Sequence, residues 1–105
     1  MEVQKCYYAS FNVGNVEVWS TELYLDRESV FFEIDESKEE IAAHIDTFSP
    51  FISEEEIKKI LKYAILNLKK FGIYKDKENN FDFFILEQPI WKNYEQKNKI
   101  NYGTN

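Results

Sequence analysis

The sequence is poor in the residues that disulfide, metal and phosphate-binding sites require. Its 105 residues include one cysteine, one histidine, three glycines and two prolines. A single cysteine excludes an internal disulfide, and one thiol with one imidazole is too few for a zinc site. Because 44% of the residues are hydrophobic and 17% are aromatic, the chain is not of the low-complexity or disordered type. We expect one folded domain without a metal or a cofactor.

Arginine and long apolar segments are also scarce. Arg27 is the only arginine beside 12 lysines, so the forked side chains that bind phosphates and bases are missing. No apolar run approaches the ~18 residues of a membrane span. The opening residues MEVQKCYY lack the basic segment and apolar stretch of a signal peptide. We therefore expect a cytoplasmic protein that is a monomer on its own and binds neither nucleic acid nor membrane.

Catalytic motifs are missing as well. The chain contains no G-x-S-x-G, no S-x-x-K and no glycine-rich phosphate loop. Cys6 lies in a predicted strand and His44 in a predicted short helix, and we interpret both as structural residues. We predict that the protein is not an enzyme. One alternative stays open, acid-base chemistry by Glu33 and Asp35, which share a face if residues 30–34 form a strand.

Aromatic and β-branched residues predict an antiparallel sheet. Turn-forming residues between the first two segments predict a hairpin, and neighbouring segments of a chain usually pair. The predicted strands are 3–11, 16–25, 30–34 and 81–86.

Two helices are predicted between the third and fourth strands. Ser37 and Ser53 each precede a glutamate by three residues, as in the capping box. Apolar residues then recur at helical spacing, and Gly72 follows as the expected C-terminal residue. The predicted helices are 38–47 and 53–71.

These elements predict an α+β domain in the order βββααβ. The four-stranded antiparallel sheet would carry both helices on one face. We place this single domain at residues 1–89. Residues 90–105 form a polar C-terminal tail, for which one option is a short docked helix.

Charge is distributed unevenly along the chain. The formal net charge is −6. Residues 17–56 contain 13 acidic residues against Arg27 and Lys38, whereas residues 57–105 contain 10 lysines against 5 acidic residues. Helix caps explain some of these acids, but not the low number of compensating bases. Such unbalanced charge destabilises the chain by self-repulsion, repels phosphates and attracts basic partners.

The acidic segment VFFEIDESKEE, residues 30–40, is therefore the candidate binding surface, with the neighbouring predicted strand beside it. Trp and Tyr often dominate binding hot spots, so two aromatic residues of that strand are candidate anchors, with core packing as the equal alternative. The candidate partner-binding residues are Glu33, Asp35, Glu36, Glu39, Glu40, Glu22, Asp26, Trp19 and Tyr24.

A small acidic α+β domain without catalytic residues resembles the immunity proteins of bacterial contact-dependent growth inhibition and related polymorphic toxin systems. The resemblance covers the general build of the chain, with VFFEIDESKEE and SEEE as acidic surface, aromatic strands and one amphipathic helix. It implies a one-to-one complex with a basic toxin domain, often a nuclease, whose active site or substrate groove is blocked.

Two other binding functions fit the same charge pattern. Anti-restriction and anti-CRISPR proteins of phages, which imitate the charge of DNA, look similar at this level. A non-catalytic subunit of a larger assembly is the second alternative.

Overall fold

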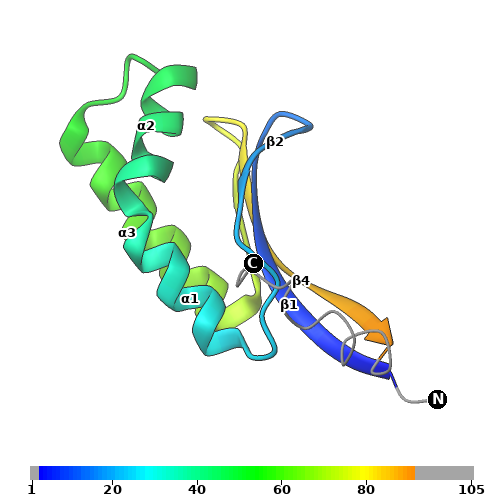
Figure 1. The fold of residues 1–105 in the computed structure, drawn as a ribbon. Helices are drawn as coiled ribbons and strands as arrows, with labels where there is room; N and C mark the ends of the chain where they lie inside the picture. The colour runs from blue at the N-terminus through cyan, green and yellow to red at the C-terminus, as the bar shows by residue number, and fades with distance from the viewer. Residues whose placement is uncertain (1–2, 92–105) are drawn as a thin grey trace.

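The computed structural model describes residues 3–91 and contains one antiparallel sheet with three helices against one of its faces (Figure 1). Strands β1 (Val3–Val13) and β4 (Phe81–Trp91) form its centre, and they pair from Val3–Trp91 to Val13–Phe81. Strands β2 (Val16–Ser20) and β3 (Ile73–Asp76) are the edges of the order β2-β1-β4-β3. The prediction of an α+β domain with a four-stranded antiparallel sheet is confirmed, but the order of elements is ββαααββ, with three helices where two were predicted.

The first hairpin forms where the turn residues predicted it. Val13 pairs with Val16 across a two-residue turn, and Gly14 has a φ of 65°, which glycine adopts without a steric penalty. Strand β2 ends at Ser20, earlier than the predicted residue 25. A single bridge between Tyr24 and Tyr7 continues the pairing.

The predicted third strand, residues 30–34, is wrong, because these residues lie in helix α1 (Arg27–Glu36). Asp26 caps this helix and accepts a hydrogen bond of 2.7 Å from the Ser29 amide. Val30 and Ile34, one helical turn apart, are fully buried. Packing against the sheet therefore outweighs the strand preference of the aromatic and β-branched residues in this segment.

Helix α2 (Lys38–Phe48) follows α1 after a single residue, Ser37. The predicted capping box at Ser37 is wrong, since its side chain makes no cap hydrogen bond. The Ser37 amide instead donates to the carbonyls of Glu33 and Ile34 at the end of α1. Ser37 ends α1 and begins α2, and its φ and ψ are −105° and 16°. These angles lie outside the extended region in which a side chain can cap a helix.

Helix α3 (Glu54–Phe71) matches its sequence prediction closely. Ser53 accepts a hydrogen bond of 3.2 Å from the Glu56 amide, and Gly72 ends the helix with a φ of 77°. The buried residues recur at helical spacing: Ile57, Leu61, Ala64 and Leu68. Phe71 is 65% exposed because it lies in the last turn of the helix, beyond the buried stretch.

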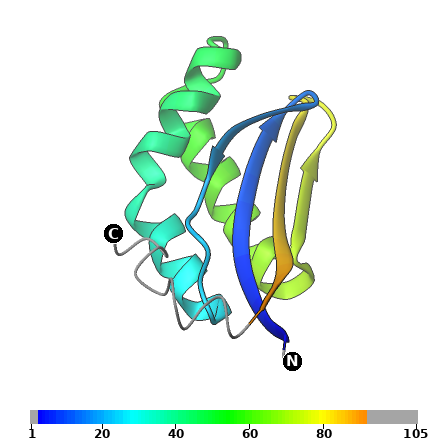
Figure 2. The same ribbon diagram turned by 45° about the vertical axis from the view of Figure 1, so that its right-hand side comes forward.

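The core lies between the helices and the sheet (Figure 2). Phe11, Phe81 and Phe83 form its centre, and the ring centroid of Phe11 lies 5.7 Å from that of Phe81 and 5.2 Å from that of Phe83. Trp19 meets Phe83 edge to face at 6.3 Å. Strand β4 runs to Trp91, so residues 90 and 91, predicted in the tail, belong to the sheet. The short docked helix predicted as one option for the tail lies outside the described residues.

Candidate acidic binding face

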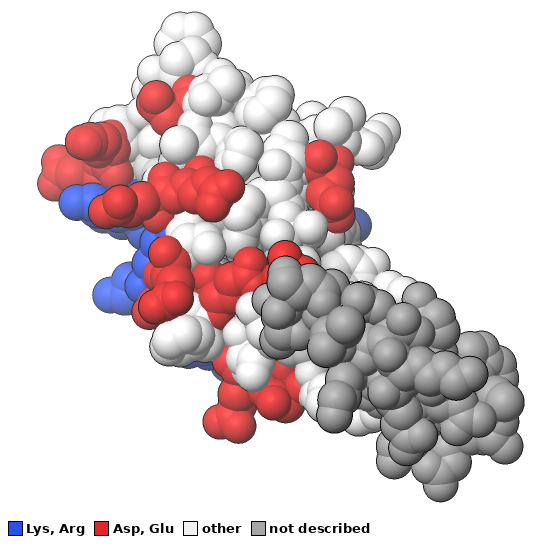
Figure 3. Space-filling view, viewed as in Figure 1, with Lys and Arg blue, Asp and Glu red and all other residues white. Residues whose placement is uncertain are grey.

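Most of the predicted partner-binding acids lie on α1, on α2 or beside them, on the helical side of the molecule. Figure 3 shows carboxylates spread over the side that these two helices present, with lysines along its margin. We call the exposed carboxylates of residues 22–40 the acidic face. They are Glu22, Asp26, Glu28, Asp35, Glu36, Glu39 and Glu40.

Few cations neutralise this face among the residues that the structure describes. Among residues 3–91, side-chain ion pairs within 4.0 Å join only Lys38 to Asp35, at 2.7 Å, and Lys5 to Glu87, at 3.6 Å. The second pair lies on the β1–β4 strands. The acidic face thus keeps a negative excess, and long-range attraction would accelerate its encounter with a basic surface.

An exposed phenylalanine lies among these carboxylates. Phe32 on α1 is 66% exposed, whereas its neighbours in the helix, Val30 and Ile34, are buried. Glu28, Asp35 and Glu36 stand four residues before it and three and four residues after it, so they are its neighbours along the helix surface. A large apolar side chain within a charged rim has the composition of a binding hot spot.

Phe32 is not among the predicted contact residues, because the sequence pattern predicts a strand at residues 30–34. In that strand, Phe32 and Ile34 would share one face; in the helix they lie about 200° apart. A signal for the helix was present in the sequence. Asp26 precedes Ser29 by three residues, and Val30 and Ile34 are four apart, which is the pattern of a capped amphipathic turn.

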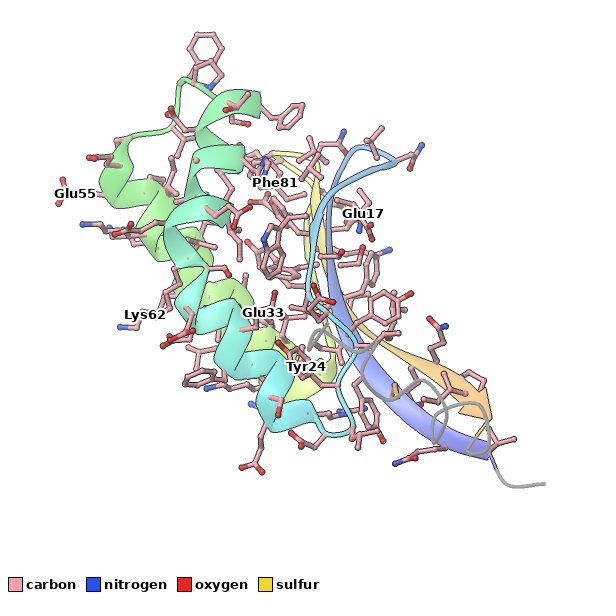
Figure 4. The ribbon with its side chains drawn as sticks, viewed as in Figure 1. Glu17, Tyr24, Glu33, Glu55, Lys62 and Phe81 are labelled. Atoms are coloured by element: carbon pink, nitrogen blue, oxygen red, sulfur yellow. The ribbon has the colours of Figure 1, made fainter. Side chains whose placement is uncertain are left out.

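Glu33 is held within the molecule rather than presented to a partner. It is half-buried, and its Oε1 accepts hydrogen bonds of 2.6 Å from the Tyr24 hydroxyl and 3.1 Å from the Glu22 amide. Figure 4 shows Tyr24 and Glu33 beside each other at the inner side of α1. Burial, the bond to Glu33 and nearby carboxylates together raise the pKa of Tyr24 to about 12.

Two other predicted residues also have local partners. The hydrogen bonds from Ser29 hold the pKa of Asp26 below its ordinary value and fix the start of α1. The hydrogen bond from Lys38 and its charge hold the pKa of Asp35 below its ordinary value. Asp26 and Asp35 therefore carry full negative charge at neutral pH, while Glu36, Glu39 and Glu40 are exposed without such partners among the described residues.

The two predicted aromatic anchors belong to the interior of the fold. Trp19 is 8% exposed and part of the core. Tyr24 is half-buried and packs against the core. The prediction of anchors was based on a strand beside the acids, and the pleat turns Trp19 toward the helices. Phe32 takes the place of both residues as the exposed aromatic of this surface.

Glu33 and Asp35 both lie on α1 and not on the strand that acid-base chemistry by this pair was predicted to require. Glu33 and Asp35 are two positions apart on a helix, so they do not share a face.

Within residues 3–91, no three His, Cys, Asp or Glu side chains gather in a way that would hold a metal ion. No helix in this part of the chain is both long and apolar enough to cross a membrane.

Comparison of the chain with protein-family models, with curated proteins and with solved structures found no match.

Proposed function

We propose that this protein binds a basic protein partner through the acidic face, with Phe32 as the central contact. The observation that carries the proposal is the exposure of Phe32 between Glu28, Asp35 and Glu36 on the surface of α1. Solvated carboxylates alone would serve solubility. A large exposed apolar side chain among them gains nothing for solubility and supports a docking role.

In its specific form, the proposal is that the protein neutralises a bacterial toxin domain. Carboxylates of the acidic face would pair with the lysines and arginines by which a nuclease normally holds phosphate. The small size, the negative excess and the compact α+β fold support this role. The complex would contain one copy of each protein.

The test begins with capture of the partner from the source organism by tagged wild-type protein, with mass spectrometry to identify it. We expect a strongly basic protein or domain. The double variant Glu36→Lys/Glu40→Lys should lose it, since both side chains are exposed on the acidic face. Phe32→Ala should weaken its binding about tenfold or more, as truncation of a hot-spot residue does.

Glu78→Lys, a single charge reversal away from the acidic face, is the control, because Glu78 is exposed in the turn between β3 and β4. It should retain the partner. Co-expression of the captured toxin domain with wild-type protein should restore growth, and co-expression with the double variant should not. Equal capture of the partner by the wild type and the double variant, in low salt, would refute the proposal.

A further inference from the structure

A second surface of opposite charge borders the acidic face, where α1 and α2 meet α3. A hollow of about 560 Å³ runs between α3 and the junction of α1 with α2. Its apolar floor is formed by Ala42, Leu61, Ile65 and Leu66. We call this hollow the lysine groove, after the residues of its rim.

Four lysines stand around the groove, in a protein whose net charge is −6. They are Lys38, Lys58, Lys62 and Lys69. Asp35 and Glu39 are the acidic residues of the lining, and Asp35 is already paired with Lys38. The rim therefore has an excess of positive charge, which the three lysines of α3 supply.

The lysines of α3 are available for a ligand. Lys58 and Lys62 have no ion pair within 4.0 Å among residues 3–91, and Figure 4 shows Lys62 pointing outward from the helical layer. The Lys69 ammonium lies 5.7 Å from the ring centre of Phe31, a contact that orients it without neutralising it. Lys58 and Lys69 are eleven positions apart, or about 16 Å along the helix.

The apolar surface continues beyond the groove. Leu66 is 55% exposed and Tyr63 is 66% exposed, and both line a second hollow of about 500 Å³ on the other flank of α3. Lys62 and Leu66 border both hollows. The helix thus presents an apolar track with cations along it, whereas the polar face of an ordinary surface helix is charged and solvated.

The geometry points to an amphipathic, acidic helical segment of a partner protein as the occupant of the lysine groove. Its apolar side chains, spaced three and four apart, would cover Ile65 and Leu66. Its carboxylates would meet Lys58, Lys62 and Lys69. A ligand with a single carboxylate would leave most of this row of about 16 Å, or about three helical turns, unpaired, so a chain with repeated acids fits it better.

This inference is independent of the proposed function, because the two surfaces have opposite charge and attract opposite partners. Only Asp35 and Glu39 belong to both, at the boundary between them. Variants of the acidic face should lose a basic partner, and variants of the lysine groove should lose an acidic peptide. Failure of one proposal is therefore distinguishable from failure of the other. One protein could therefore join two others, one on each surface.

The test is selection from a phage-displayed library of 16-residue peptides on the full chain. We expect enrichment of sequences with Leu or Phe at helical spacing and flanking Glu or Asp. A selected peptide, labelled with fluorescein, should bind the wild type in fluorescence anisotropy. In ¹⁵N–¹H NMR spectra, its addition should shift the amides of Ala42, Ile65 and Leu66.

Two variants and a matched control locate the binding. Lys58→Glu/Lys62→Glu should bind the selected peptide about tenfold more weakly, since each exposed charge pair contributes up to about fivefold. Leu66→Ser should weaken binding about fivefold through loss of apolar contact. Lys75→Glu/Lys77→Glu reverses the same number of exposed charges near β3 and should bind like the wild type.

Enrichment of basic or uncharged peptides, shifts at another surface, or unchanged affinity of Lys58→Glu/Lys62→Glu would each overturn the inference. Decanoate, an apolar chain with one carboxylate, tests for a small-molecule site. The inference would also be overturned if decanoate displaced the peptide and bound Lys58→Glu/Lys62→Glu as weakly as the peptide does. Self-association of the wild type that the lysine variant abolishes would overturn it too, because the occupant would then be a second copy.

Discussion

The hydroxyl of Tyr24 donates a hydrogen bond of 2.6 Å to the carboxylate of Glu33. Tyr24 also pairs with Tyr7 of β1 through two backbone hydrogen bonds of 2.7 and 2.9 Å. Glu33 belongs to α1. This contact therefore joins the first helix to the central strand through the segment that follows β2, and it sets the position of α1 and its exposed carboxylates.

Removal of the Tyr24 hydroxyl should destabilise this junction. We expect Tyr24→Phe to lower the free energy of unfolding by about 1–2 kcal/mol, because a hydrogen bond to a charged group is lost and the Glu33 carboxylate keeps only the Glu22 amide. Urea denaturation followed by circular dichroism measures this change. Tyr63→Phe is the control, since Tyr63 is 66% exposed and should change stability little. Equal effects of the two substitutions would contradict this account.

The raised pKa of Tyr24 predicts a loss of stability at alkaline pH. Its pKa is about 12 in the folded protein and about 10 in an unfolded chain. The folded state therefore favours the protonated phenol, and the stabilisation is complete below pH 10 and lost between pH 10 and 12. Tyr74, also raised to about 12 by burial and Asp76, acts in the same direction.

Absorbance at 295 nm measures this titration directly. Wild-type protein should show tyrosines that ionise near pH 12, and Tyr24→Phe should remove one of them. Tyr74→Phe should remove the other. A wild-type titration with every tyrosine ionising near pH 10 while the protein is still folded would be incompatible with these environments.

Neighbouring residues of α1 should differ sharply in their sensitivity to truncation. Ile34→Ala should lower the free energy of unfolding by about 2–5 kcal/mol, because Ile34 is fully buried. Phe32→Ala should change it by about 0.5 kcal/mol or less, since Phe32 is 66% exposed. Chemical denaturation of both variants distinguishes the helix from a strand, in which the two side chains would be buried together and would lose similar amounts.

The end of α3 depends on glycine. Gly72 has a φ of 77°, and a Cβ atom there would meet no atom within 4 Å beyond its chain neighbours. Gly72→Ala should therefore destabilise the protein by about 1–2 kcal/mol through the backbone alone. Gly72→Asn should cost less, because asparagine tolerates the left-handed region. Thermal unfolding of both variants, with equal losses for Ala and Asn, would indicate a packing effect instead.

The sequence predicted the elements whose signals are local. Helix α3 has its cap, its apolar stripe and its terminal glycine within one segment, and all three are where the pattern places them. Strand β3 (Ile73–Asp76) was not predicted. It is only four residues long, and it is a strand only because it pairs with residues 81–84. Residues 30–34 were misassigned because their helical state depends on burial of Val30 and Ile34 against the rest of the fold.

The same distinction applies to the candidate site. Charge is a property of the sequence, so the acidic segment was predictable, and its exposure follows from the hydration of carboxylates. The anchor was not predictable without the correct helix, because a change from strand to helix turns Phe32 outward and Trp19 inward. The lysine groove requires α1, α2 and α3 together, and no segment of the sequence specifies it alone.

The pairing of β1 with β4 also determines when the protein can fold. The central strand β1 meets its longest partner only after residues 14–80 and then β4 have been synthesised. Until then, β1 has one edge without a strand, and the closure of a long loop has to precede the contacts that stabilise it. During translation, the β1–β2 hairpin and the helices would emerge before the sheet exists. Folding therefore follows release of β4 from the ribosome, and a chain halted before residue 81 exposes a strand edge prone to aggregation.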